Sequence, residues 1–318
     1  MWSLLNFDIQ SFGEKPKLIL TSVGKVIDCQ SVEQISPELF RKIDAIIVRL
    51  GWQLQGKFLK KFNKLKVIAS ITTGLDHIDL KYCSKQGIKI LSLKGETDFL
   101  QKITATPEMT WCLLLSLIRK LPSGFSSVLE GHWERNSFFG NELNNKSLGI
   151  IGFGRVGKIL GRYGIAFGMN ICAFDIQPIR FRDYPVKQVS LQELLSTSDV
   201  VSVHLPLEDS TYHLLGEEHF QQMKPSAYFL NTARGAIVDE EALLTALKSQ
   251  TIAGAAVDVI ENEMEPSHIN IKHPLIQYAS GHNNLIISPH IAGSTYESME
   301  KTALFITNKL TNYIKIHA

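Results

Sequence analysis

The sequence predicts an α/β protein with two parallel sheets in two domains. Three observations lead to this fold class. The chain has 318 residues, which is more than a single hydrophobic core usually holds. Short apolar runs alternate with helical stretches along most of the chain, as is typical of parallel sheets covered by helices. A glycine-rich turn follows one of these apolar runs near the middle of the chain.

The first hundred residues contain short apolar runs of the kind expected for strands buried on both faces. We interpret these runs as strands at 18–20, 45–48, 67–69 and 88–91. Helical segments are expected between them, near 37–43, 55–63 and 79–86, with Gly87 as the C-cap of the last.

One long helix is expected at 107–121. Pro107 suits its first turn, whereas Pro122 and Gly124 are expected to end it. Its side chains are apolar almost all round, so we expect it to be buried.

A second series of strands and helices begins at residue 147 and predicts a complete doubly wound sheet. The strands are expected at 147–151, 169–175, 199–203, 227–231, 252–257 and 285–288. The helices between them are expected at 155–167, 190–196, 216–222 and 239–248. A final helix from about Ser294 is left over and could pack on the first domain. We therefore expect one domain at 1–100, completed by 294–318, and the other at 101–293.

Composition and charge exclude several classes of partner. The net charge is +2 with both signs scattered, so neither nucleic acid nor an anionic membrane is expected to bind. The 4 cysteines form no CxxC pair, which argues against a metal site or a disulfide framework and favours a reducing compartment. No apolar run is long enough for a signal peptide or a membrane span, so we expect a cytoplasmic protein.

The glycine-rich turn has the sequence context of a dinucleotide-binding fingerprint. The apolar run 147–151 leads into Gly152, Gly154 and Gly157, and a helix follows. The first glycine permits a tight turn, the second lets the backbone approach a pyrophosphate, and the third allows close helix–strand packing. Arg155 and Val156, within the fingerprint, open that helix, whose N-terminus favours phosphate groups.

An acidic residue follows the next strand at the expected spacing. Asp175 ends the run that starts at Asn170, and its carboxylate can accept hydrogen bonds from the ribose hydroxyls of an adenosine. A 2′-phosphate would meet a like charge there, so the sequence favours NAD over NADP. Arg180 and Arg182 lie close by and weaken this preference slightly.

Together with further motifs, the fingerprint resembles the D-isomer-specific 2-hydroxyacid dehydrogenases, whose members include D-3-phosphoglycerate dehydrogenase. The other motifs are TGLDHID at 73–79, VHLP at 203–206, MKP at 223–225, NTARG at 231–235, AAVD at 255–258 and SPHIAG at 288–293. The resemblance implies two Rossmann-like domains: a doubly wound cofactor domain and a smaller flavodoxin-like substrate domain built from both chain ends. It also implies NAD as cofactor, a small 2-hydroxy or 2-oxo acid as substrate, and usually a homodimer.

The resemblance assigns the catalytic roles to Arg234, Glu263 and His290. A guanidinium suits two-point recognition of a carboxylate and a carbonyl oxygen, and an imidazole titrates near neutrality. A carboxylate beside the imidazole would orient it and stabilise its charged form. The usual family pattern has a proline directly after this glutamate, but here Pro266 follows Glu265. Counting from Asp258 selects Glu263, whereas counting back from the proline selects Glu265, and we prefer Glu263.

The same resemblance implies the remaining contacts. Cofactor contacts are expected from Thr106, His204, Pro206, Thr232, Ala233 and Asp258. Asp258 matches a contact to the nicotinamide carboxamide, and the alternative is a carboxylate that holds a turn at a strand end. For the substrate, the backbone N–H groups of Thr73 and Gly74 match a carboxylate-binding loop, Arg49 matches a position that reaches a distal charge, and Arg234 contacts the reacting end.

Two other functions stay open. One is an NAD-binding scaffold or sensor of the same fold that performs no turnover. The other is a phosphite or formate dehydrogenase, although a glutamate beside the histidine argues against formate because those relatives carry glutamine there.

Overall fold

The computed structural model describes residues 1–264 and 271–317, and the chain divides into two compact units. The first unit comprises Met1–Ile103 and Ser294–Ala318, and the second comprises Thr104–Gly293. The sequence had predicted a boundary after residue 100. Every strand pairing in the described chain is parallel. The predicted fold class, an α/β protein with two Rossmann-like domains, is confirmed.

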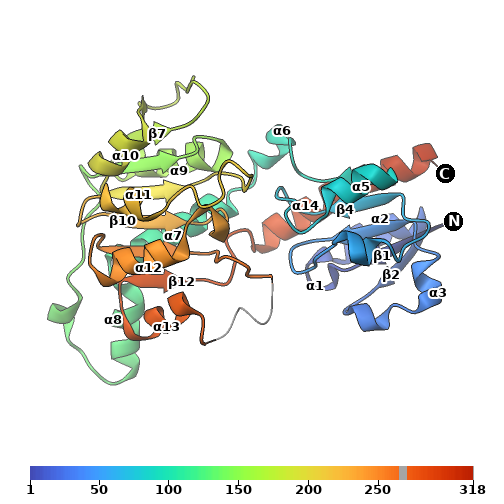
Figure 1. Cartoon of the computed structure of the whole chain (residues 1–318), viewed down its shortest axis with the longest axis horizontal. Coiled ribbons are helices and arrows are strands. Elements are labelled where there is room, and N and C mark those ends of the chain that lie inside the picture. Colours follow the sequence, from blue (N-terminus) through green and yellow to red (C-terminus); the bar gives the residue numbers. More distant parts are fainter. Residues whose placement is uncertain (265–270, 318) are drawn as a thin grey trace. The chain divides into compact units, whose positions relative to one another are not determined.

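The sheet of the first unit has the strand order β2-β1-β3-β4-β5 (Figure 1). The strands are β1 (Trp2–Asn6), β2 (Gly24–Asp28), β3 (Ala45–Val48), β4 (Val67–Ser70) and β5 (Lys89–Leu91). This is the flavodoxin-like order, in which the winding direction changes between β1 and β3. Ligand-binding groups of such sheets lie beyond the carboxyl ends of the strands at that point.

Alternate residues of these strands face two separate apolar cores. Leu4, Ala45 and Val67 contribute to the core under α1 (Ile9–Phe12), α2 (Glu14–Thr21), α6 (Thr97–Leu100) and α14 (Tyr296–His317). Leu5, Ile46 and Ile68 contribute to the core under η1 (Val32–Gln34), α3 (Pro37–Phe40), α4 (Gly56–Leu59) and α5 (Leu80–Gln86). The last helix therefore completes the core of the first unit. Gly87 caps α5 in the left-handed conformation, as predicted.

The predicted strand at 18–20 is wrong, because these residues lie in the helix α2. Leu20 is buried while Leu18 is 74% exposed, which is the pattern of an amphipathic helix. A run of three apolar residues is too short for its periodicity to distinguish a strand from a helix. The strands that do occupy this part of the sheet, β1 and β2, were not predicted.

The sheet of the second unit has the order β12-β11-β10-β9-β6-β7-β8. The strands are β6 (Ser147–Ile151), β7 (Asn170–Phe174), β8 (Lys187–Gln188), β9 (Val200–Val203), β10 (Tyr228–Asn231), β11 (Gly254–Val257) and β12 (Leu285–Ile287). The order is that of a doubly wound sheet, and its winding reverses between β6 and β9. All the predicted strands of this unit are present, whereas the two-residue β8 was not predicted.

Helices cover both faces of this second sheet (Figure 1). One face packs against α7 (Ala105–Ile118) and α9 (Arg155–Ala166). The other packs against α10 (Leu191–Thr197), α11 (Glu217–Gln221), α12 (Glu240–Lys248) and α13 (Pro274–Gly281). Two short 3-10 helices, η2 (Arg135–Phe138) and η3 (Gly235–Ile237), also belong to this unit.

The helix predicted at 107–121 is interrupted earlier than expected. Lys120 adopts a left-handed conformation with φ 52°, and a second helix, α8 (Leu121–Leu129), starts with Pro122 in its first turn. Pro122 therefore opens a helix and does not end one. In the described part of the chain no single helix is long and apolar enough to cross a membrane. The pair α7 and α8, bent by 64°, is long and apolar enough when taken together, by length and composition only. Much of α7 is buried in the core of the second unit, as predicted.

Candidate active site

The three predicted catalytic residues follow neighbouring strands of the second unit. Arg234 comes three residues after β10, Glu263 lies in the segment after β11, and His290 comes three residues after β12. Because these strands are parallel and adjacent, their carboxyl ends lie along one edge of the sheet. Neighbouring strands are about 4.8 Å apart, so the ends of β10 and β12 are separated by roughly 10 Å. The fold thus brings the three chain segments to one edge.

His290 and Glu263 are hydrogen-bonded to each other. The Nδ1 atom of His290 lies 2.5 Å from a carboxylate oxygen of Glu263, and their side chains are 22% and 19% exposed. A carboxylate on Nδ1 fixes the tautomer of the ring and leaves Nε2 as the nitrogen that can exchange a proton. The alternative partner, Glu265, lies outside the described residues.

The turn that carries Arg234 is held by a residue that the sequence reasoning missed. The side chain of Asn231 donates to the carbonyl of Arg234 at 2.9 Å and accepts from the N–H of Ala233 at 3.0 Å. An asparagine at a strand end is a known signal of such a turn. Gly235 follows, and a Cβ atom there would lie 2.1 Å from the carbonyl carbon of Ile260. The Arg234 turn therefore packs directly on the backbone that leads to Glu263.

The glycine-rich turn has the geometry that dinucleotide binding requires. Gly152 has φ 91°, and a Cβ atom there would lie 2.6 Å from the carbonyl oxygen of His204. A Cβ atom on Gly157 would lie 2.5 Å from the carbonyl oxygen of Gly152, so helix α9 meets the turn closely. Around Gly154, by contrast, a Cβ atom would meet nothing within 4 Å, which leaves room for a pyrophosphate beside the helix N-terminus. Arg155 and Val156 lie in the first turn of that helix.

Asp175 lies directly after β7, and its carboxylate is tied to the glycine-rich turn. One oxygen accepts from the N–H of Phe153 at 2.9 Å, and the other accepts from the N–H of Gln177 at 2.9 Å. The carboxylate is half-buried and sits at the carboxyl end of the strand next to β6. This is the position from which an acidic residue reaches the adenosine ribose in this fold.

His204 follows β9 and carries no charge at neutral pH. Burial lowers the pKa of His204 to about 3, and the positive charge of Arg155 acts in the same direction. Its Nε2 lies 2.8 Å from the hydroxyl oxygen of Ser202. Pro206, two residues further on, accepts a hydrogen bond from Thr211 on its carbonyl at 2.7 Å. A neutral imidazole and a rigid turn therefore lie beside the glycine-rich loop.

Thr106 and Thr232, both predicted to contact the cofactor, are linked through a third threonine. The hydroxyl of Thr110 donates to the carbonyl of Thr106 at 2.8 Å and lies 2.7 Å from the hydroxyl of Thr232. Thr110 is fully buried on α7. The sequence offered no signal for it, because the contact joins residues 122 positions apart. Ala233 lies next to Thr232 in the turn held by Asn231.

Asp258, predicted to contact the nicotinamide, is fully buried directly after β11. Its carboxylate accepts hydrogen bonds from Ser288, Ile291 and Ala292 in the loop that carries His290. The structure thus gives Asp258 a role in holding that loop, and its contact with a nicotinamide stays a prediction.

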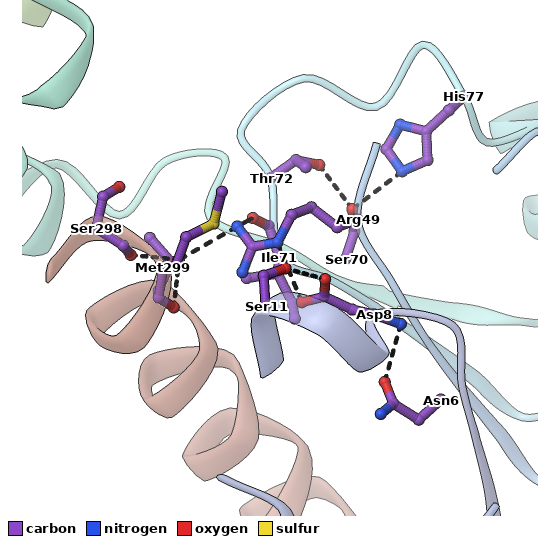
Figure 2. Close-up of polar contacts among 11 residues, drawn as sticks. Asn6, Asp8, Ser11, Arg49, Ser70, Ile71, Thr72, His77, Ser298 and Met299 are labelled. Carbon is purple, nitrogen blue, oxygen red and sulfur yellow. Dashed lines mark hydrogen bonds and ion pairs between the residues drawn. The ribbon is translucent and has the colours of Figure 1, made fainter. Parts of the chain in front are cut away.

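In the first unit, Arg49 lies one residue after β3 at the point where the winding changes direction (Figure 2). Its Nε donates to the carboxylate of Asp8 at 3.1 Å, and Nη1 lies 3.4 Å from both the carbonyl of Ile71 and the hydroxyl of Thr302. Asp8 and Arg49 are 7% and 15% exposed, and Nη2 is buried without a hydrogen-bond partner. The sequence did not indicate Asp8, which lies 41 positions away.

The loop that contains Thr73 and Gly74 follows β4 in the same unit. The hydroxyl of Thr72 donates to the carbonyl of Gly74 at 2.6 Å and lies 2.7 Å from the hydroxyl of Ser70. The same hydroxyl of Ser70 lies 3.3 Å from Nε2 of the buried His77 (Figure 2). The side chains of Ser70, Thr72 and His77 therefore form a hydrogen-bonded chain that holds this loop. Arg49 and this loop belong to the first unit, and the other candidate residues belong to the second.

A doubly wound sheet, a dinucleotide-binding glycine turn and a carboxylate–imidazole pair at the same edge define a dinucleotide-dependent oxidoreductase. Comparison with known proteins agrees. The model of the NAD-binding domain of D-isomer-specific 2-hydroxyacid dehydrogenases matches residues 111–292. The chain therefore belongs to the D-isomer-specific 2-hydroxyacid dehydrogenase family, and it is an NAD-dependent enzyme.

Individual relatives differ in the substrate that their names give. A glyoxylate reductase from Thermococcus litoralis is 34% identical over 87% of this chain and 82% of its own length. A D-3-phosphoglycerate dehydrogenase from Archaeoglobus fulgidus is 36% identical over 87% of this chain, which spans 51% of that protein. The crystal structure of D-lactate dehydrogenase from Aquifex aeolicus, in complex with NAD and lactic acid, has a TM-score of 0.86 at 29% identity. It covers 98% of this chain and 95% of its own.

Proposed function

We propose that this enzyme transfers a hydride between NAD(H) and C2 of a small D-2-hydroxy or 2-oxo acid. The observation that carries the proposal is the hydrogen bond between Glu263 and His290 at the sheet edge that also carries Arg234. This set supplies a proton donor, a group that stabilises its charge, and a cation for an acid substrate. The family and the names of the relatives support the same class of reaction.

In the reductive direction, bound NADH supplies the hydride to C2. The guanidinium of Arg234 would hold the substrate carboxylate and the carbonyl oxygen, which polarises the carbonyl group. The charged imidazole of His290 would then give the proton on Nε2 to that oxygen, which completes the hydroxyl group. Glu263 stabilises the imidazolium before the transfer and keeps the proton on Nδ1 afterwards. In the oxidative direction each proton step runs in reverse.

Two further substrate contacts are assigned to residues of the first unit as part of this proposal. The backbone N–H groups of Thr73 and Gly74 would bind the substrate carboxylate, and the guanidinium of Arg49 would meet a group at the other end of the substrate. The unpartnered Nη2 of Arg49 supports this role. A buried donor without a partner costs free energy, and an acceptor on the substrate would remove that cost.

The cofactor contacts are assigned on the same basis. The carboxylate of Asp175 would bind the ribose hydroxyls of the adenosine, and its position beside Phe153 of the glycine-rich turn supports this. The turn itself would hold the pyrophosphate at the open side of Gly154. The neutral His204 with Pro206, and the linked Thr106 and Thr232 with Ala233, would line the rest of the cofactor site.

A screen of 2-oxo acids tests the proposal. The purified protein is mixed with NADH and, separately, with glyoxylate, pyruvate, hydroxypyruvate and 3-phosphohydroxypyruvate, and the loss of NADH absorbance is followed. We expect turnover with at least one of these acids and with NADH in preference to NADPH. Tight NADH binding without turnover of any acid would instead indicate a scaffold or sensor, and oxidation of phosphite with NAD would indicate the other alternative.

We also infer that the enzyme is a homodimer, and an exposed apolar surface supports this. Large apolar side chains between 49% and 87% exposed cluster in α8 and the segment after it: Leu121, Phe125, Val128, Leu129, Trp133 and Phe139. Apolar surface of this kind on a folded unit favours association. Phe125→Ser with Leu129→Ser should give a monomer in light scattering, while Ile316→Ser, at an exposed site of α14, should not. A dimer that survives the double substitution would contradict this.

The 4 cysteines are free thiols, which supports a reducing compartment such as the cytoplasm as the location. Localisation of the tagged chain in its own cells would test this directly.

A further inference from the structure

The Glu263 turn, residues 261–264, is held at its first residue by a side chain of α12. The main-chain N–H of Glu261 donates to the carboxyl group of Glu240 at 2.7 Å. Glu240 is the first residue of α12 and lies 21 positions earlier in the chain. Because Glu261 is two residues before Glu263, this hydrogen bond fixes the start of the turn from which the Glu263 side chain reaches His290.

Glu261 has contacts on two sides, and the one with Glu240 is the better shielded from water. The side chain of Glu240 is 19% exposed, and its second oxygen lies 3.3 Å from Nε2 of His273, which is 10% exposed. On the outer side, the carboxylate of Glu261 accepts from the hydroxyl of Tyr212 and lies 2.9 Å from Nε2 of His213, which is 34% exposed. Water weakens polar contacts at the surface, so the hydrogen bond to Glu240 holds the turn more firmly than the outer contacts.

The helix start that carries Glu240 is itself fixed. The carboxylate of Asp239 caps α12 and accepts from two main-chain N–H groups of its first turn at 3.0 and 3.1 Å. The main chain at Glu261 also packs on the Arg234 turn, since a Cβ atom on Gly235 would lie 2.3 Å from its nitrogen. The Glu263 turn therefore has a rigid support on this side, and the carboxyl group of Glu240 is the side-chain group that binds the turn to it.

A carboxyl group at this place lowers the stability of the folded chain at neutral pH. Burial raises the pKa of Glu240 to about 7. The negative charges of Glu261 and Glu263 raise it further, whereas the hydrogen bond from Glu261 and a positive charge on His213 lower it. An apolar side chain of the same size would avoid this cost. A group that lowers stability and contacts a candidate active site is a candidate for a functional role.

We propose that Glu240 is a positioning residue for proton transfer: its carboxyl group holds the Glu263 turn so that Glu263 stays on Nδ1 of His290. It acts through the main chain of Glu261 and not by contact with the reacting atoms. This inference rests on the proposed function, because it takes His290 as the group that exchanges the substrate proton.

Two substitutions of Glu240 test the role. Glu240→Met has a similar volume but offers no acceptor to the N–H of Glu261. Glu240→Gln keeps an acceptor oxygen for that N–H, and its NH2 group can donate to Nε2 of His273. The control is Asp199→Leu at the amino end of β9, where the carboxylate also accepts from a distant main-chain N–H, that of Ser147 at 2.8 Å.

We expect Glu240→Met to lower kcat about 10- to 10²-fold, since a displacement of about 1 Å can cost that much. The pH above which reduction slows should also be lower in this variant, because a displaced Glu263 stabilises the charged imidazole less. Glu240→Gln should restore both kcat and the pH profile. The Kd of NADH, measured by fluorescence, should stay close to that of the unmodified protein in all variants. Asp199→Leu should leave kcat and the pH profile unchanged even if it lowers Tm.

Three results would contradict this role. Glu240→Met could show the kcat and pH profile of the unmodified enzyme, which would mean that the turn needs no such support. Glu240→Gln could lose as much activity as Glu240→Met, which would mean that the charge of Glu240 acts and not its hydrogen bond. The loss of kcat could also follow Tm across all variants, Asp199→Leu included, which would indicate a general loss of structure.

A measurement without turnover separates this inference from the proposed function. The proton between Nδ1 of His290 and Glu263 should give a downfield NMR signal in the unmodified protein. It should broaden or shift in Glu240→Met but not in Glu240→Gln or Asp199→Leu. If no 2-oxo acid is reduced, the proposed function fails, and the signal still decides whether Glu240 holds the turn. An unchanged signal in Glu240→Met would exclude this.

Discussion

The two sheet edges that carry the candidate residues hold their charged groups in different ways. In the second unit, the buried side chains of Asn231 and Asp258 bind main-chain groups of the loops that carry Arg234 and His290. In the first unit, the side chains of Asp8 and Arg49 bind each other, and the arginine keeps one donor without a partner.

The difference teaches how a sheet edge can serve two purposes. Hydrogen bonds to the main chain fix the position of a whole loop, which suits groups that must transfer a proton over a short distance. A pair of side chains fixes only their ends, which suits a charge that attracts and binds a ligand. The predictions below test this division, beginning with the largest expected effect.

The acid–base role is tested first. His290→Gln should lower kcat by about 10²- to 10⁴-fold, because an amide cannot supply the proton. The affinity for NADH, measured by fluorescence, should not change. His213→Gln offers a control, since His213 also bonds to a carboxylate, that of Glu261 at 2.9 Å. Substantial turnover in His290→Gln would remove this residue from the mechanism.

The second test concerns Arg234, the positive charge that the second unit is proposed to place on the substrate. Arg234→Gln should lower kcat/KM by about 10²- to 10³-fold, since it removes a charged donor from the reacting oxygen. The expected loss falls on kcat as well as on KM, because the contact strengthens in the transition state. If only KM rises, the guanidinium contributes equally to ground state and transition state, and the contrast between the units weakens.

Glu240 extends the comparison between the two units. It is a buried carboxylate of the second unit whose charged form destabilises the folded protein. It accepts from the N–H of Glu261 at 2.7 Å and lies 3.3 Å from Nε2 of His273. Burial outweighs the hydrogen bond from Glu261 and raises the pKa of Glu240 to about 7. The folded state therefore keeps a proton that the unfolded state releases near pH 4.5, so this group lowers stability as pH rises from that value to about 7.

Glu240→Gln removes this pH dependence. Relative to the unmodified protein, the variant should gain stability as pH rises through that window, by at most roughly 3 kcal/mol. Denaturant unfolding at several pH values measures the difference. A constant difference between the two proteins would show that Glu240 ionises normally in the folded state.

The smallest effect is expected in the first unit. Arg49→Gln should raise KM by about tenfold for a 2-oxo acid with a negative group at the distal end and leave kcat nearly unchanged, as uniform binding predicts. Asp8 then loses its ion-pair partner, so Asp8→Asn with Arg49→Gln serves as the variant without an unpaired buried charge. A fall in kcat equal to that of Arg234→Gln would erase the proposed division between the units.

The sequence allowed the cofactor sheet and the main site motifs to be predicted, because each is local. Gly152, Gly154 and Gly157 have a meaning within six residues, and Arg234 and His290 lie in short motifs directly after apolar strands. These signals need no knowledge of the rest of the chain.

The supporting residues could not be predicted in the same way. Asp8, Thr110 and Ser288 gain their roles from partners 30 to 122 positions away. The error at residues 18–20 has a similar cause, since only packing against the sheet and α14 decides that Leu20 belongs to a helix. The break at Lys120 depends on one left-handed residue that is not a glycine, for which the sequence gives no signal.

The position of α14 in the sequence has a consequence for the order in which the chain folds as it leaves the ribosome. Residues 1–103 are made before residues 294–318, yet Ala303, Ile306, Leu310 and Ile314 are buried in the core that residues 1–103 build. Residues 104–293 contain the whole second unit without interruption. Residues 104–293 can therefore finish folding during translation, while residues 1–103 must wait for α14.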